Sequence, residues 1–200
     1  MRKFWIGLTT IAALSLAGCA TTPKPVHPQI AFLSNIAKYC GQAFEGKVVA
    51  NEPKTDEPDP FETQRLIMHV RGCADPEMRL EIPFHVGEDH SRTWILRRTP
   101  GGIQLKHDHR HRDGSPDGEL MYGGETMYGG TASRQEFPID AETMSMFHRE
   151  GRLVSVTNVW AMEIHDDNFV YELARPGGRM FRVQFDLTNP VELPPTPWGY

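Results

Sequence analysis

The chain from Thr93 to His109 reads TWILRRTPGGIQLKHDH. Two strand-like segments, Thr93–Arg98 and Ile103–His109, flank Pro100-Gly101-Gly102, and this combination of turn residues is a hairpin signal. In the second segment Ile103 and Leu105 alternate with polar residues, which is the period-two pattern of a half-buried strand. The stretch therefore predicts an antiparallel hairpin with one face toward a core.

The same pattern recurs along the chain, interrupted by turn residues every eight to twelve positions. Ten segments are expected as strands: Phe44–Ala50, Arg65–Arg71, Met78–Val86, Thr93–Arg98, Ile103–His109, Glu119–Tyr122, Thr131–Phe137, Leu153–Ile164, Phe169–Ala174 and Met180–Leu187. Short connections favour a mainly β domain, an antiparallel up-and-down barrel or sandwich. By strand count alone the pattern resembles the calycin barrels, although it lacks the Gly-x-Trp signature of lipocalins near its first strand.

Two helices are expected beside the strands. Residues 30–40 carry apolar side chains at positions 30, 33, 36, 37 and 40, which is helical spacing. Asp140 is a typical N-cap for a second helix over residues 141–150. Three side chains of that helix are expected to face the core: Met144, Met146 and Phe147. The acidic, proline-containing segment 51–61 predicts a surface loop.

The N-terminus has the features of a secretory signal. Arg2 and Lys3 precede an apolar stretch, residues 4–17, which is too short and wrongly flanked for a membrane helix. Leu16-Ala17-Gly18-Cys19 resembles the lipobox of bacterial lipoproteins, which implies cleavage before Cys19 and diacylation of its thiol. The residue after Cys19 is Ala20, whereas the inner-membrane retention signal of enteric bacteria has an Asp at this position. The resemblance therefore implies a lipid-anchored envelope protein, on the outer membrane facing the periplasm if the cell is Gram-negative.

These features divide the chain into a signal peptide (1–18), a proline-rich tether (19–29), a single β-rich domain (30–193) and a proline-rich tail (194–200). The formal charge of the whole chain is −5. Removing the signal leaves 19 Lys and Arg against 26 Asp and Glu, a charge of −7. An acidic chain argues against a nucleic-acid partner, because nucleic-acid binding needs a basic face.

Two cysteines remain after processing, Cys40 and Cys73. Export places them in an oxidising compartment, where an even number of thiols usually forms disulfides. A disulfide between them would fasten the first helix to the sheet. Two free buried thiols are the alternative, and a metal site is disfavoured because the pair lacks Cys-x-x-Cys spacing.

Histidines supply the only concentrated chemistry. If the strand that begins at Ile103 continues, period two places His107, His109 and His111 on its apolar face, climbing toward the mouth of a barrel. Neutral imidazoles that converge on one point can hold zinc, with a third ligand from a neighbouring strand. Candidates for that ligand lie two strands earlier: His85, Asp89 and His90. A hydrogen-bonded polar cluster at a strand end, or adventitious metal binding, is the competing interpretation.

The tetrapeptide Met-Tyr-Gly-Gly occurs twice, at residues 121–124 and 127–130. Glycine pairs allow tight turns. Tyr122 and Tyr128 could therefore line a ligand pocket at its rim, or pack on the barrel wall beside a flexible loop.

Over most of the mature domain the chain also resembles a group of small exported bacterial proteins. The runs Ile82–Trp94 and Leu105–His111 carry this resemblance. It implies export and a shared domain, and it assigns no activity and no site residue.

The sequence carries no Gly-x-Ser-x-Gly elbow, no His-Glu-x-x-His motif and no Walker or dinucleotide motif. The leading expectation is therefore a non-enzymatic envelope lipoprotein whose barrel binds a small ligand or an envelope partner. The alternative is a zinc-dependent enzyme centred on His107, His109 and His111, with a metal-bound water as the nucleophile.

Overall fold

The computed structural model describes residues 1, 26–54, 56–118 and 120–200. Residues 2–25, which include the predicted lipobox and most of the tether, lie outside this part of the chain. The elements are, in order, α1 (Pro28–Ala37), β1 (Ala43–Glu52), α2 (Pro60–Thr63), β2 (Leu66–His69), β3 (Arg79–Val86), β4 (Asp89–Arg98), β5 (Ile103–His109), β6 (Tyr122–Glu125), β7 (Arg134–Pro138), α3 (Ala141–Arg149), the 3-10 turn η1 (Leu153–Ser155), β8 (Val159–Ile164), β9 (Asn168–Arg175) and β10 (Arg179–Val191).

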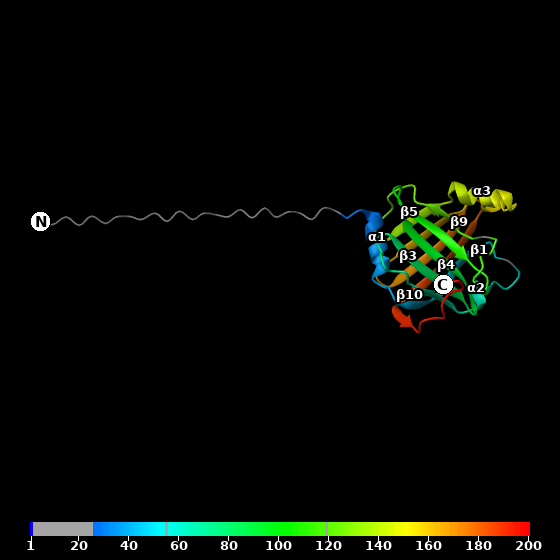
Figure 1. Ribbon diagram of the computed structural model, residues 1–200, viewed down its shortest axis with the longest axis horizontal. Helices are drawn as coiled ribbons and strands as arrows, with labels where there is room; N and C mark the ends of the chain where they lie inside the picture. Colours follow the sequence, from blue (N-terminus) through cyan, green and yellow to red (C-terminus); the bar gives the residue numbers. More distant parts are fainter. Residues whose placement is uncertain (2–25, 55, 119) are drawn as a thin grey trace.

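The ten strands form one antiparallel sheet that curls into a nearly closed barrel (Figure 1). Its strand order is β6-β5-β4-β3-β2-β1-β10-β9-β8-β7, so consecutive strands pair except β6 with β7, and β1 pairs with β10. The predicted up-and-down barrel is confirmed and the sandwich is excluded. In the β4–β5 hairpin Trp94 lies opposite His107, which aligns the two inward faces.

The barrel closes at a narrow seam between β6 and β7. Gly124 forms an isolated bridge with Ile139, and the Asp140 N–H donates to the Gly123 carbonyl over 3.2 Å. A Cβ on Gly124 would lie 2.2 Å from the carbonyl oxygen of Pro138 on β7, and the seam can therefore form only if this residue has no side chain.

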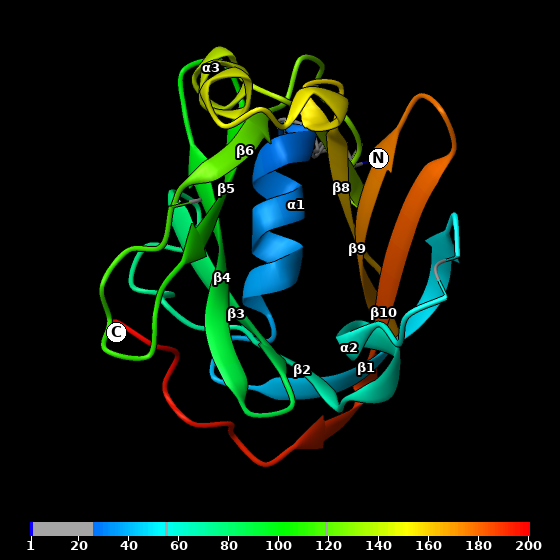
Figure 2. The ribbon, with the colours of Figure 1, turned by 90° about the vertical axis from the view of Figure 1, so that its right-hand side faces the viewer.

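Helix α1 plugs one end of the barrel. Figure 1 places it at one end of the strands, and Figure 2 shows it inside the ring that they form. Its side chains Phe32, Leu33 and Ile36 are buried in the core. Gln29 Nε2 donates to Thr126 Oγ1 over 2.9 Å, and Asn35 Nδ2 donates to the Ala132 carbonyl over 3.0 Å. These contacts fix the helix to the loop that joins β6 to β7.

The predicted disulfide is present between Cys40 and Cys73, with 6.3 Å between the Cα atoms. Cys40 follows α1, and Cys73 lies in the connection between β2 and β3. The bond therefore fastens the plug helix to the wall of the barrel.

Several expectations for individual segments were wrong. The predicted loop 51–61 includes the end of β1 and the start of α2, because Asp59 caps that short helix through the N–H of Phe61 at 2.9 Å. Residues 153–155 form a 3-10 turn before β8 begins. The sixth strand starts at Tyr122, because residues 122–125 are the ones that pair with β5, and the predicted start at residue 119 lies outside the described residues.

Helix α3 has the predicted bounds to within one residue, and Asp140 caps it by accepting from the N–H of Thr143 over 2.8 Å. Its buried stripe consists of Thr143 and Phe147, four residues apart, with Met146 partly buried beside them. Met144 lies off that stripe and is 38% exposed, so the expectation that it faces the core was wrong.

No helix in the described part of the chain is both long enough and apolar enough to cross a membrane.

Candidate functional site: the open mouth of the barrel

A cavity of about 290 Å³ occupies the end of the barrel opposite the α1 plug. Side chains from α2 and its N-cap and from strands β3, β4, β5, β6, β9 and β10 line it: Asp59, Phe61, Phe84, Arg92, Trp94, His107, His109, Tyr122, Tyr171, Leu173, Arg179 and Phe181. Six of these twelve side chains are Phe, Tyr or Trp. The cavity is therefore a recess with aromatic walls and a few polar groups.

The walls present flat ring faces because inward aromatic side chains stack on one another, both between neighbouring strands and across the barrel. Trp94 stacks on Phe84 with ring centroids 4.8 Å apart, and on Tyr171 with centroids 4.4 Å apart. His107 stacks on Tyr122 at 4.4 Å with an interplanar angle of 6°. Stacked and edge-on rings of this kind hold one another in fixed positions.

His107 is buried, and both of its ring nitrogens have partners. Nδ1 lies 3.2 Å from the Tyr122 carbonyl, which can only accept, so we assign the proton to Nδ1. Nε2 then accepts from the Tyr171 hydroxyl, 2.8 Å away. Burial, with a smaller effect of His109, lowers the pKa of His107 to about 3. The imidazole is therefore a neutral part of the wall at physiological pH.

His109 lies one pleat closer to the mouth than His107. Its Nδ1 is 3.6 Å from Asp117 Oδ2, and its Nε2 is 3.4 Å from the Tyr122 hydroxyl. Burial lowers the pKa of His109, and the charge of Arg92 adds to this effect while three nearby carboxylates oppose it. Burial also raises the pKa of Tyr122 above its ordinary value. Both groups are thereby held in their neutral forms.

Two arginines stand at the rim of the cavity. Arg92 pairs with Asp89 at 2.5 Å, and its guanidinium lies 5.3 Å from the ring centroid of Phe61. Arg179 lies 5.4 Å from the ring centroid of Phe181. The two phenylalanine rings are in contact, with centroids 5.1 Å apart. The rim therefore contains the guanidinium groups of two arginines with the two phenylalanine rings packed between them.

Of the six residues predicted as metal ligands, only His107 and His109 line the cavity. His107 and His109 share the inward face of β5, but β5 ends at His109, and His111 lies exposed in the following turn, where its N–H donates to the Ser115 carbonyl over 2.9 Å. The expectation that His111 continues the face was wrong because the strand stops before it.

The other three predicted ligands lie elsewhere. His85 and His90 contact each other through their Nδ1 atoms at 2.7 Å and line a groove beside the C-terminal segment Glu192–Pro195. Asp89 is bound to Arg92. Within the described ranges, no group of three or more His, Cys, Asp or Glu side chains is arranged to hold a metal ion.

The two Met-Tyr-Gly-Gly copies have different surroundings. Tyr122 lines the cavity, as one interpretation of the repeat expected, whereas Tyr128 is 82% exposed and is not among the residues that line it.

Three residues that line the cavity were not predicted from the sequence: Arg92, Arg179 and Tyr171. The first has a signal in the sequence: Arg92 has the same strand phase as Trp94, which pairs with His107.

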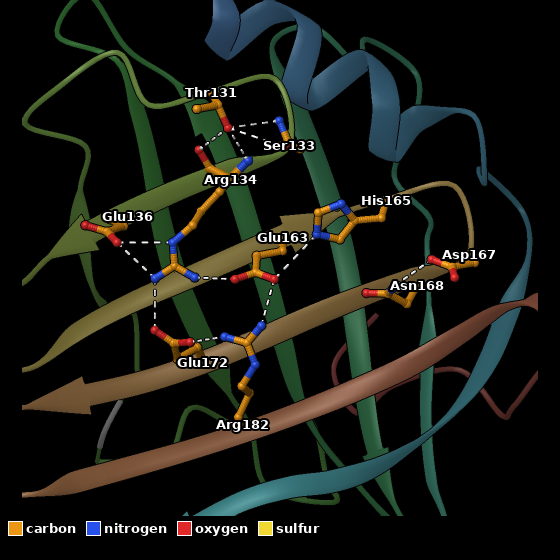
Figure 3. Close-up of polar contacts among 10 residues, drawn as sticks. All are labelled: Thr131, Ser133, Arg134, Glu136, Glu163, His165, Asp167, Asn168, Glu172 and Arg182. Atoms are coloured by element: carbon orange, nitrogen blue, oxygen red, sulfur yellow. Dashed lines mark hydrogen bonds and ion pairs between the residues drawn. The ribbon is translucent and has the colours of Figure 1, made fainter.

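A second polar cluster lies on the outer face of the barrel, where Arg134, Glu163, Arg182 and Glu172 form a closed ring of ion pairs (Figure 3). Glu163 and Arg182 are 2.7 Å apart, and Arg134 and Glu172 are 3.0 Å apart. Burial raises the pKa of Glu163, but bonds from Arg182 and Arg134 outweigh it and leave the pKa lowered. Because all four carboxylate oxygens are bonded within the ring, we assign it a structural role: it links β7, β8, β9 and β10.

No protein-family model, curated protein or solved structure matches this chain. The functional argument therefore depends on the geometry of the cavity.

Proposed function

We propose that this protein is a membrane-anchored envelope lipoprotein whose barrel binds a small ligand with a flat apolar body. The ligand-binding part of the proposal rests on the aromatic cavity at the open mouth of the barrel. Helix α1 closes the barrel at its other end. Small-molecule sites are typically concave, mostly apolar recesses of about 300 to 1,000 Å³ with a few polar groups. This cavity is at the small end of that range, which favours a ligand of one or two rings.

The chemistry of the walls supports an uncharged ligand body. Trp94 and Phe84 offer ring faces for stacking, and the deep polar groups are already satisfied by one another, as in the Tyr171–His107 hydrogen bond. A ligand body with buried polar groups would find no free partner on these side chains, whereas an apolar ring would gain contact and lose water.

A matched pair of cavity variants tests ligand binding. Leu173→Trp places an indole in the cavity without removing a polar group, and Leu153→Trp makes the same change at an exposed position. We expect 2-naphthylmethanol to bind the parent and Leu153→Trp at one site, with a Kd on the order of 0.1 mM by calorimetry, and not to bind Leu173→Trp. A parent that binds no probe, or equal binding to both variants, would overturn the proposal.

The lipid anchor is tested separately. It is supported by the lipobox-like sequence that ends at Cys19. Globomycin should cause the unprocessed form to accumulate, and Cys19→Ser should move the protein from the detergent phase to the aqueous phase. A Cys19→Ser protein that still partitions into detergent would contradict the anchor and leave the ligand site unaffected.

A further inference from the structure

We infer that the ligand of this cavity is an aromatic anion, whose negative group binds at the rim between Arg179 and Arg92. This inference rests on the proposed function, because it names the ligand class of the same site. It concerns the rim of the cavity, whereas the proposed function depends on its aromatic interior.

The two guanidinium groups face one recess from distant parts of the wall. Arg92 belongs to β4 and Arg179 to β10, which are four places apart in the ten-strand order. Both line the cavity, and each packs against one of the two phenylalanine rings, Phe61 or Phe181. A ligand that enters past these rings must pass between two positive charges.

Arg179 has no negative partner among the residues that the structure describes. Its Nη1 donates to Asn51 Oδ1 over 2.7 Å and to the Glu52 carbonyl over 3.3 Å, and both acceptors are neutral. These two bonds and the Phe181 ring hold the guanidinium in place. It is therefore a fixed cation with nitrogen donors left over, which suits a carboxylate that accepts two hydrogen bonds.

The carboxylates near the rim are already engaged. Asp59 accepts from the N–H of Phe61 at 2.9 Å and from Asn51 Nδ2 at 2.9 Å, and Asp89 accepts from Arg92 and from the N–H of Ser91. Asp89 balances the charge of Arg92, so the charge of Arg179 is the one that a ligand anion would balance. Asp59 reaches Arg179 only through the bridging amide of Asn51.

The electrostatic influence of the rim extends into the cavity. Burial is the main reason that the pKa of His109 is lowered, and the positive charge of Arg92 is the next. At the level of His109 that charge is opposed by the carboxylates of Asp117, Asp89 and Asp108, which would repel a negative group. Because His107, Tyr122 and Tyr171 stay neutral below that level, the favourable place for the anion is the rim, with the ring body deeper against Trp94.

Two probes that share one ring system test the inference: 2-naphthoate, which carries the charge, and 2-naphthylmethanol, which does not. We expect the parent to bind 2-naphthoate about ten- to a hundredfold more tightly, because a hydrogen bond to a charged group is stronger than one between neutral groups. Arg179→Met should remove most of this preference and change the Kd of the alcohol less than about threefold. Arg179→Lys should restore part of it, because the charge is kept and the planar pair of donors is lost.

Arg97→Met is the matched control, because Arg97 is exposed on the outer face and bonds Gln104. It should keep the full preference, and thermal unfolding should show that each variant is folded. If Arg179→Met does not fold, Arg92→Met and Arg179→Lys still measure the preference. The anion site would be overturned if the parent bound both probes equally, or if the double variant Arg92→Met/Arg179→Met kept the preference for 2-naphthoate. Either result would leave the proposed ligand cavity standing. A folded parent that binds neither probe would overturn the proposed function and this inference together.

Discussion

The hydroxyl of Tyr171 donates a hydrogen bond to Nε2 of His107 over 2.8 Å, joining β9 to β5 through the interior of the barrel. It leaves His107 no free nitrogen, since Nδ1 is bound to the Tyr122 carbonyl. The histidine that the sequence offers as a metal ligand is therefore part of the wall of the cavity.

Tyr171→Phe should destabilise the protein by about 1 to 3 kcal/mol, because it leaves a buried imidazole nitrogen without a donor. The free energy of unfolding in urea at pH 7 measures this. Adding His107→Leu to Tyr171→Phe removes the orphaned acceptor, so the double variant should lose less than the sum of the two single variants. Additive losses would show that the two residues are not coupled.

The free energy of unfolding should fall as the pH falls below about 6.5. The pKa values of His107 and His85 are lowered by burial to about 3 and about 4, so in this range the unfolded chain binds protons that the folded chain does not. Above the unfolded pKa both states are neutral and the effect vanishes. Each pH unit between the two values costs about 1.4 kcal/mol per histidine.

The variant His107→Gln separates the contribution of His107 to this pH dependence from that of His85. Between pH 7 and pH 5 the variant should lose about 2 kcal/mol less stability than the parent. His111→Gln, at an exposed position, should follow the parent curve. A His107→Gln curve that parallels the parent would mean that this imidazole titrates normally in the folded protein.

Zinc should not bind stoichiometrically at the His107/His109 pair. A ligand imidazole needs a free nitrogen, and His107 would have to break its bond to Tyr171 to provide one. Elemental analysis of tag-free protein purified without chelator, together with the melting temperature with and without zinc, measures this. One zinc per chain that disappears in both His107→Ala and His109→Ala would restore the metal-enzyme alternative.

Gly123→Ala should destabilise the barrel by about 1 to 3 kcal/mol or more, because the new methyl group overlaps the carbonyl of Leu105 on the paired strand β5. The equivalent glycine of the second Met-Tyr-Gly-Gly copy, Gly129, has no atom within 4 Å of the position that a Cβ would take. Gly129→Ala should therefore be close to neutral. Similar melting temperatures for the two variants would contradict this close approach of β5 and β6.

Removing the Cys40–Cys73 bond should cost about 3 to 4 kcal/mol, the chain-entropy value for a loop that spans a sequence separation of 33 residues. Denaturant unfolding of Cys40→Ala/Cys73→Ala, compared with the parent in the presence and absence of reductant, measures this. The variant should be insensitive to reductant. Two alkylatable thiols in protein isolated from an oxidising compartment would show that the bond does not form there.

The strand pattern was sufficient to predict the barrel and the inward face of β5. The alternation of apolar and polar residues indicates which side chains of a strand share a face. The Trp94–His107 register follows from one short hairpin. The alternation does not tell where a strand stops, and this is why His111 was wrongly placed with His107 and His109. A turn that begins after His109 is set by contacts with Ser115, which the alternation of residues 103–111 does not contain.

The rim could not be predicted because it joins residues that only barrel closure brings together. Arg92 and Arg179 are 87 positions apart in the sequence, and their common cavity depends on the pairing of β1 with β10. Phe61 comes from a four-residue helix within a segment that has the composition of a loop. Its cap, Asp59, is a recognisable signal, but the position of the helix over the mouth is a tertiary property.

The plug helix also sets the direction in which the barrel would face. The continuously described part of the chain starts at the plugged end, where Val26 precedes α1. A lipid on Cys19 lies seven residues before Val26, so it could be at most about 25 Å away along the chain. An anchored protein would therefore turn its blind end toward the bilayer and its mouth toward the aqueous compartment. A cavity that opens in this direction exchanges ligand with the aqueous compartment. Its occupancy would therefore depend on the concentration of dissolved ligand there and not on the composition of the membrane.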